Sequence, residues 1–148
     1  MSRELIEAGL GWRYRPAHIR RLICDPDTIV LIAKDRQRVS GFAIMAFGDE
    51  RAHLVLLAVL PADRRQGTGR RLVEWLLESA ATAGIASVHL ELRADNPAAR
   101  AFYRALGFTD TLLIPGYYGG RETALRMLRV LCATAPAVVS WQARFDKL

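Results

Sequence analysis

The hydrophobic and polar positions of the chain follow the period of strands in some stretches and the period of helices in others. Three runs rich in Val, Ile, Leu and Phe come in succession, at Thr28–Ala33, Gly41–Phe47 and His53–Leu60, and short polar stretches connect them. Connections of this length predict an antiparallel meander. The third run is apolar on both faces, which predicts a central strand covered on both sides.

Helical periodicity predicts three helices. Pro16–Cys24 begins with a proline at a position that helices tolerate, and Gly67–Ala83 is the longest, with Gly84 as its C-terminal cap. Asn96–Leu106 is the third, and Gly107 ends it. The apolar stripe predicted for the longest helix consists of Leu72, Trp75, Leu76, Ser79, Ala80 and Ala83.

Two further segments complete the predicted fold. Ser87–Leu92 is typical of a short strand, and Arg121–Leu131 of a final strand that follows the turn-rich segment Pro115–Gly120. The pattern contains no linker and no repeat, which favours a single domain over residues 1–148, with 131–148 as a candidate C-terminal extension. The predicted fold class is α/β, with a mixed, mostly antiparallel sheet flanked by helices.

The two ends of the chain are less regular. Met1–Leu10 is more typical of a helix or an ordered arm than of a strand, and its interleaved charges are unlike a signal peptide. The tail Cys132–Leu148 carries enough apolar surface to pack as an extra helix or against a partner subunit, so a homodimer is a candidate. Its large apolar residues are Val138, Val139, Trp141 and Phe145.

Composition narrows the function classes. The 148 residues are 51% hydrophobic and 24% charged, which is enough apolar material for a sizeable core. No apolar run approaches the roughly 20 residues that a membrane-spanning helix needs, since the longest, Leu54–Leu60, has the length of a strand. The sequence therefore predicts a cytoplasmic protein with no membrane partner.

The net charge of +6 is carried mostly by arginines that occur singly and in pairs along the chain. This spread does not form a nucleic-acid-binding stripe, so no nucleic-acid partner is predicted, whereas a polyanionic cofactor suits the charge. Cys24 and Cys132 lack both metal-ligand spacing and the density of a disulfide scaffold. They are predicted to be reduced, partly buried thiols, and no metal site is predicted.

The segment Arg64–Gly69 lies between the third strand and the longest helix. Backbone N–H groups at a helix start lack partners and the helix dipole is positive there, so a diphosphate can accept from several of them. Gly67 and Gly69 remove side chains that would block this approach. The arginines that add positive charge are Arg64, Arg65, Arg70 and Arg71. Neither a P-loop nor the three-glycine dinucleotide fingerprint is present, so these residues alone predict an anion site.

The stretch from Leu56 to Leu72 resembles the acetyl-CoA motif of the GNAT acetyltransferase superfamily, Arg/Gln-x-x-Gly-x-Gly/Ala after Val-x-Pro. The resemblance implies the acyl-CoA N-acyltransferase fold and acetyl-CoA as co-substrate. It implies that the CoA pyrophosphate lies on the loop residues Arg64, Arg65, Gln66, Gly67, Thr68, Gly69 and Arg70. It also implies that the pantetheine arm lies on the main chain of Ala58, Val59 and Leu60. Arg65 departs from the pattern, because many members carry a glycine there.

The resemblance extends to the predicted helix that begins at Asn96. Asn96, Ala99 and Tyr103 fall on one helical stripe, and the superfamily uses this stripe to contact the cofactor. Asn before Pro is also a favoured N-cap that needs no ligand, and Tyr103 can equally be a core aromatic. The similarity is to bacterial ribosomal-protein alanine N-acetyltransferases and covers about Leu54–Val130, roughly half the chain.

Amine acetylation needs a base for the protonated amine and an acid for the departing thiolate. Glu91 is the candidate base, because it matches the family's glutamate and lies on a strand whose burial would raise its pKa. The alternative interpretation is that Glu91 forms a purely structural ion pair with an arginine such as Arg93 or Arg121. His89, on the same face as Glu91, and His53 are alternative bases or relays. The resemblance implies that Tyr103 is the acid and that the main-chain N–H of Val59 polarises the thioester carbonyl.

These inferences predict an acetyl-CoA-dependent N-acetyltransferase that acts on a primary amine, foremost a protein or peptide N-terminus, by direct attack in a ternary complex. Two alternatives stay open: an enzyme for small amines, and a module that binds acyl-CoA without catalysis. Tyr117 and Tyr118 are equally typical of an acceptor-pocket wall and of cover over the end of the sheet.

Overall fold

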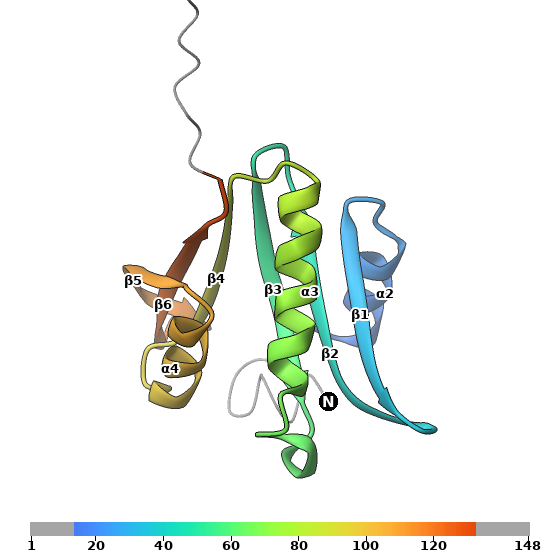
Figure 1. Ribbon diagram of the computed structural model, residues 1–148. Helices are drawn as coiled ribbons and strands as arrows, with labels where there is room; N and C mark the ends of the chain where they lie inside the picture. The colour runs from blue at the N-terminus through green and yellow to red at the C-terminus, as the bar shows by residue number, and fades with distance from the viewer. Residues whose placement is uncertain (1–13, 133–148) are drawn as a thin grey trace, which may run out of the picture.

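Residues 14–132 are described in a computed structural model of the protein, in which one six-stranded sheet has the strand order β1-β2-β3-β4-β6-β5 (Figure 1). Its strands are β1 Thr28–Asp35, β2 Arg38–Phe47, β3 Arg51–Val59, β4 Ser87–Arg93, β5 Thr109–Tyr118 and β6 Glu122–Val130. Its helices are α2 Pro16–Cys24, α3 Thr68–Thr82, α4 Pro97–Ala105 and the short 3-10 turn η1 Pro61–Asp63. The predictions for Met1–Leu10 and for the tail beyond Cys132 lie outside the described residues.

The pairing of the strands confirms a mixed, mostly antiparallel sheet. β1, β2 and β3 pair antiparallel in sequence order, which is the predicted meander. β3 and β4 pair parallel, and α3 makes the crossover connection between them that parallel strands need. β4, β6 and β5 again pair antiparallel.

One face of the sheet is buried under α3 and α4, which lie in front of it in Figure 1, while α2 packs along β1 on the other side. The stripe predicted for α3 was correct at Leu72, Leu76 and Ala80 but wrong at Trp75, Ser79 and Ala83, which are not buried. The buried sector is centred between Leu72 and Val73, and Trp75 points away from this centre because each residue turns the helix by 100°. The buried residues of α3 are Thr68, Leu72, Val73, Leu76, Leu77 and Ala80.

Strand β5 was missed by the sequence pattern, which predicted only turns at Pro115–Gly120. The strand runs through Pro115 and Gly116 to Tyr118, with an irregularity in its pairing to β6 between Ile114 and Tyr118. β5 lies at the edge of the sheet, where a proline costs no ladder hydrogen bond on the open side. The hairpin β5–β6 places Tyr118 toward the C-terminal end of β4, because Tyr118 pairs with Glu122 and Arg93 of β4 pairs with Ala124.

β3 and β4 separate soon after they meet. Their register covers only residues 51–53 against 87–89, although β3 continues to Val59 and β4 to Arg93. Figure 1 shows the two strands diverging toward the end of the molecule where α3 begins and α4 lies. The opening therefore faces the start of α3, which was predicted to hold a diphosphate.

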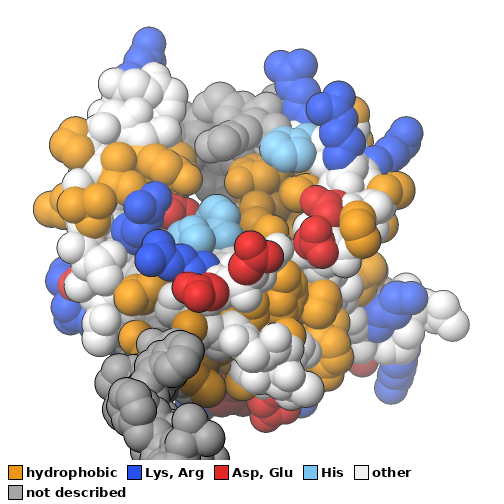
Figure 2. Space-filling model, turned by 90° about the horizontal axis from the view of Figure 1, so that it is seen from above, with side chains coloured by type: hydrophobic (Ala, Val, Ile, Leu, Met, Phe, Trp, Pro, Cys, Tyr) orange, Lys and Arg blue, Asp and Glu red, His pale blue; other side chains and the backbone are white. Residues whose placement is uncertain are grey.

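The face of the molecule drawn in Figure 2 carries charged side chains of both signs. Figure 2 shows basic and acidic side chains interspersed with apolar ones on this face. Cys24 and Cys132 are free, as predicted, but both are exposed rather than partly buried. Among residues 14–132, no helix is long and apolar enough to cross a membrane.

Candidate active site

The start of α3 leaves its backbone donors open. Gly67 is the N-cap in the left-handed conformation, with φ of 80°, and no side chain caps the helix or places an acidic group in its first turn. The N–H of Arg71 bonds the Gly67 carbonyl at 3.0 Å, so the amides of residues 68–70 belong to the turn that has no intrahelical acceptor. The geometry suits the predicted anion.

The side chains of the loop are arranged around this open end. Arg65 adopts φ of 60°, a conformation that favours glycine and explains why a glycine suits this position. Arg70 pairs with Glu74 at 2.7 Å, so part of its charge is offset. Gln66 donates to the Ala62 carbonyl at 3.2 Å, and the buried Thr68 lines a cavity of about 600 Å³ between α3 and β1. The main chain is thus the part of this loop that remains free to meet a ligand.

The end of β3 presents its main chain to the opening at alternate residues. Leu60 donates its N–H to the Ser40 carbonyl of β2 at 2.8 Å. Because main-chain groups alternate between the two edges of a strand, Ala58 also faces β2 and Val59 faces the opened edge. The Val59 carbonyl accepts from Arg64 Nε at 3.1 Å there. Of the three residues predicted to bind pantetheine, Val59 directs its main chain to the opening.

Helix α4 brings the second predicted half-site against the first. Asn96 is the N-cap, and its Oδ1 accepts from the Ala99 N–H at 3.0 Å, as the capping alternative predicted. A Cβ on Gly69 would lie 3.5 Å from the Phe102 ring, an ordinary contact distance, so the start of α3 lies against α4. Tyr103 is buried at this junction with its ring edge-on to Phe102, and burial raises its pKa above the usual range.

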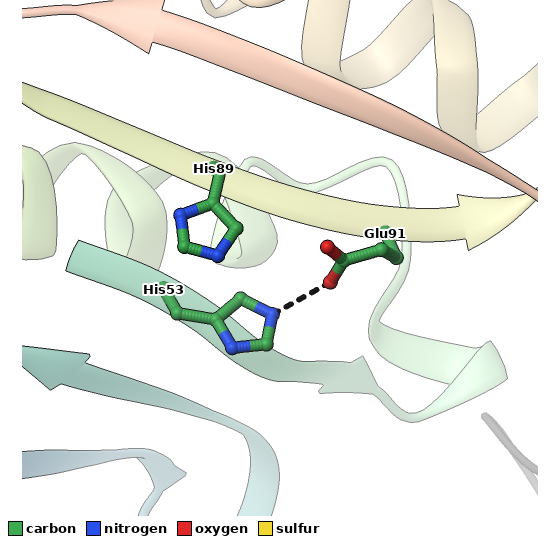
Figure 3. Close-up of side chains that lie close together, drawn as sticks. All are labelled: His53, His89 and Glu91. Atoms are coloured by element: carbon green, nitrogen blue, oxygen red, sulfur yellow. Dashed lines mark hydrogen bonds and ion pairs between the residues drawn. The ribbon is translucent and has the colours of Figure 1, made fainter. Parts of the chain in front are cut away.

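On the opposite face of the sheet, His53, His89 and Glu91 lie together beside the opening (Figure 3). His53 Nε2 and Glu91 Oε2 are 2.7 Å apart. The ring of His89 stacks on that of His53 with centroids 4.5 Å apart and planes 4° apart, because the two residues pair across β3 and β4. Arg126, opposite Glu91 on β6, donates from Nε to Glu91 Oε1 at 2.8 Å.

The charge state of Glu91 differs from the prediction. Its side chain is 5% exposed, and burial does raise its pKa, as expected. The hydrogen bonds from His53 and Arg126 and the charges of these groups outweigh burial and lower the pKa to about 2. Glu91 is therefore an ionised carboxylate at neutral pH. Its arginine partner is Arg126, and neither Arg93 nor Arg121 was the correct choice.

A family model for acetyltransferases of the GNAT family matches residues 3–108. The chain belongs to the GNAT acetyltransferase family. It is 40% identical over 93 residues to the ribosomal protein bS18-alanine N-acetyltransferase of Escherichia coli K12, across 61% of this chain. That match spans 63% of the relative's length, less than two thirds.

Solved structures of the family have the same fold. Ard1 from Thermoplasma volcanium aligns with a TM-score of 0.79 and 28% identity over 88% of each chain. The ribosomal-protein-S18-alanine N-acetyltransferase from Escherichia coli aligns with a TM-score of 0.76 and 29% identity, over 90% of this chain and 88% of that one. The GNAT fold predicted from the acetyl-CoA motif is thereby confirmed.

Within this GNAT site, the three side chains of the His53 cluster offer donor atoms that all lie within 4.8 Å of one another. Two imidazoles and a carboxylate are a donor set that divalent transition metals accept. Glu91 already binds His53 and Arg126, so an ion would have to replace these contacts. The absence of a metal from the reaction stays a prediction.

Two contributors to the site were not found from the sequence. Arg126 has no local signal, because only the β4–β6 register places it opposite Glu91. Tyr118 was interpreted equally as a wall of the acceptor pocket and as cover over the sheet end, and its pKa is raised by burial first and then by neighbours that include Glu91. Tyr118 in turn contributes to the raised pKa of Tyr103.

The ion-paired Glu91 predicts a pH dependence of stability. A carboxyl whose pKa falls from 4.5 when unfolded to about 2 when folded stabilises the protein above pH 4.5, and this contribution is lost as pH falls toward 2. The free energy of unfolding of the protein should exceed that of Glu91→Gln by about 1–3 kcal/mol at pH 6, with the difference shrinking by pH 3. Urea unfolding at both pH values measures it. A difference in the free energy of unfolding that does not change with pH would show that the charge of the Glu91 carboxylate does not stabilise the folded protein.

Proposed function

We propose that this GNAT protein is an acetyl-CoA-dependent N-acetyltransferase whose acceptor is the N-terminal amine of a protein or peptide. The observation that carries the proposal is the opening between β3 and β4, which has an uncapped helix start at one side and an ionised carboxylate at the other. The acetyl donor and the amine would meet in this opening, and the amine would attack the thioester directly. The similarity to ribosomal-protein alanine N-acetyltransferases supports this choice of acceptor.

The proposed cofactor path runs from the start of α3 along the opened edge of β3. The amides of residues 68–70 would hold the pyrophosphate, and the pantetheine arm would follow Val59, whose N–H would polarise the thioester carbonyl. The start of α3 lies close to Phe102 of α4. Ala99 and Tyr103 of the same helix are proposed to line the cofactor side. The proposed reaction calls for neither a metal nor a nucleic acid, and a cytoplasmic setting would supply the acetyl-CoA.

The proposed acceptor side is the sheet face of His53 and Glu91. An N-terminal amine has a pKa near 8 and is mostly protonated at pH 7, so it must lose a proton before it attacks. The negative charge of Glu91 would attract the ammonium group to this side. Tyr118, half-buried beside Glu91, is proposed to wall the acceptor pocket rather than only to cover the sheet end.

Tyr103→Phe should lower kcat about tenfold while the dissociation constant of acetyl-CoA changes less than twofold. The hydroxyl is proposed to protonate the leaving thiolate, and the raised pKa keeps its proton in place until then. The ring remains in the variant, so packing against Phe102 and Phe108 persists. Steady-state thiol release and calorimetric titration of acetyl-CoA measure the two constants. Parallel loss of binding and turnover would show that Tyr103 serves packing instead.

The proposal is tested by incubating the protein with acetyl-CoA and a panel of acceptors, with thiol release and mass spectrometry as readouts. The panel contains peptides with free and blocked N-termini, polyamines, amino acids and an aminoglycoside, in buffer with a chelator. Acetylation of the free N-terminus, and none of its blocked form, is expected. Turnover only on small amines would transfer the assignment to a small-molecule enzyme. Acetyl-CoA binding without any turnover would favour the alternative of a module that binds acyl-CoA without catalysis. A protein that does not bind acetyl-CoA would contradict the proposal.

A further inference from the structure

His53 is the accessible member of the bonded pair that faces the acceptor side. Its side chain is 32% exposed, whereas that of Glu91 is 5% exposed, so an incoming amine or its bridging water meets the imidazole first. The 2.7 Å contact from His53 Nε2 to Glu91 Oε2 assigns the Nε2 hydrogen to this bond, because the carboxylate is ionised and can only accept. The Nδ1 lone pair of His53 is then left to take a proton.

Glu91 is poorly suited to hold the proton itself. A carboxyl group whose pKa is about 2 gives up its proton far more readily than an ammonium group with a pKa near 8. Glu91 would therefore hold the proton of the amine only briefly. Its second oxygen is held by Arg126 at 2.8 Å, which leaves it little freedom to turn. Glu91 has the properties of a fixed negative charge.

We propose that His53 is the group that accepts the proton of the acceptor amine, and that Glu91 positions its imidazole and stabilises the imidazolium. The assignment rests on the proposed acetyltransferase function and names the base of that reaction. A buried carboxylate also orients the histidine base of serine proteases. Here the histidine and the carboxylate come from two neighbouring parallel strands.

The step balances as follows. The amine nitrogen forms a bond to the thioester carbonyl carbon, the carbon–sulfur bond breaks, and the electron pair leaves with the CoA thiolate. The ammonium group gives up two protons. The first passes to His53 Nδ1, directly or through one water, before the nitrogen attacks, and the second leaves the nitrogen when the tetrahedral adduct collapses. The thiolate receives a proton from Tyr103, and the second amine proton restores the Tyr103 hydroxyl. The imidazolium then loses its proton to solvent, which its exposed side chain reaches.

Other charged groups around His53 support this role. His89 stacks on the His53 ring, and burial and the neighbouring His53 lower the pKa of His89 and favour its neutral form. Arg126 of β6 is bound to Glu91, and Tyr118 of β5 lies near the same carboxylate. Glu91 is thus the one anion among these four described neighbours, and it is the group in contact with His53.

The test compares His53→Gln with His89→Gln in full-length protein, using an N-terminal peptide, saturating acetyl-CoA and a chelator. Glutamine keeps an N–H donor for Glu91 but cannot take a proton near neutral pH. His53→Gln should lower kcat about a hundredfold, and His89→Gln less than fivefold. The wild-type rate should rise with pH around neutrality, and this limb of the profile should be missing in His53→Gln. Acetyl-CoA affinity should be unchanged in both variants.

A second variant guards against a misfolded or mispositioned site. His53→Ala removes the side chain and leaves space for free imidazole. Millimolar imidazole should raise the rate of this variant at least tenfold, and the increase should grow with the neutral fraction of the added imidazole. Full activity of His53→Gln with an unchanged pH profile would overturn the proposal. Absence of rescue together with a retained neutral-pH limb would also overturn it. If the wild-type protein acetylates no amine, the acetyltransferase function fails instead, which distinguishes the two outcomes.

Discussion

Glu91→Gln is expected to lower kcat about a hundredfold while acetyl-CoA affinity changes less than twofold. The carboxylate is the buried negative charge at the opening, and the amide that replaces it has no charge to hold an imidazolium or to attract an ammonium group. Replacing the buried carboxylate that orients a catalytic histidine by an amide costs up to about 10⁴ in kcat in serine proteases. The measurement is thiol release under saturation with both substrates.

Glu74→Gln is the matched control for this variant. Glu74 also pairs with an arginine, Arg70, at 2.7 Å, but on the exposed face of α3. Its loss should change kcat less than twofold, as surface ion pairs contribute little. If Glu91→Gln kept more than a third of the wild-type kcat, Glu91 would be a structural ion pair and the catalytic reading of this sheet face would fail.

Gly67→Asp is expected to weaken acetyl-CoA binding by about thirtyfold or more. A Cβ at this position meets nothing within 4 Å, and Asp tolerates the left-handed conformation that Gly67 adopts, so the helix should still form. The new carboxylate would lie near both phosphates. At about 4 Å each charge pair costs about 1 kcal/mol in water and up to about 4 kcal/mol near a protein surface, so about 2–8 kcal/mol in total. Calorimetric titration with acetyl-CoA measures the loss.

Gly67→Asn separates charge from shape in this experiment. Asparagine has the same size as aspartate, tolerates the same backbone conformation and also caps the helix start, but it carries no charge. Gly67→Asn should weaken acetyl-CoA binding about tenfold or less. Raising the salt concentration should reduce the difference in acetyl-CoA affinity between the two variants. Equal affinities of Gly67→Asp and Gly67→Asn would show that the start of α3 does not hold the diphosphate.

The elements that were predicted well from the sequence are those with a strong local period. α2 was predicted at its observed bounds, and β1 to β4, α3 and α4 within three residues at either end. β5 was missed because Pro115 and Gly116 indicate a turn, and only its place at the sheet edge makes them acceptable in a strand. Trp75 was misassigned because neighbouring apolar residues on a helix cannot be ranked until the core is known.

The sequence by itself determined the helix start that is proposed to bind the diphosphate, because glycines and a helix dipole act within a few residues of one another. It also placed Asn96 and Tyr103 on one face of a helix. Only the tertiary structure decided what surrounds Glu91, since His53 comes from β3 and Arg126 from β6, at sequence distances that no local pattern reports. Burial alone would have raised the pKa of this carboxyl, and the two partners lower it to about 2. Electrostatic balance at a site depends on contacts between strands, and those exist only once the sheet has formed.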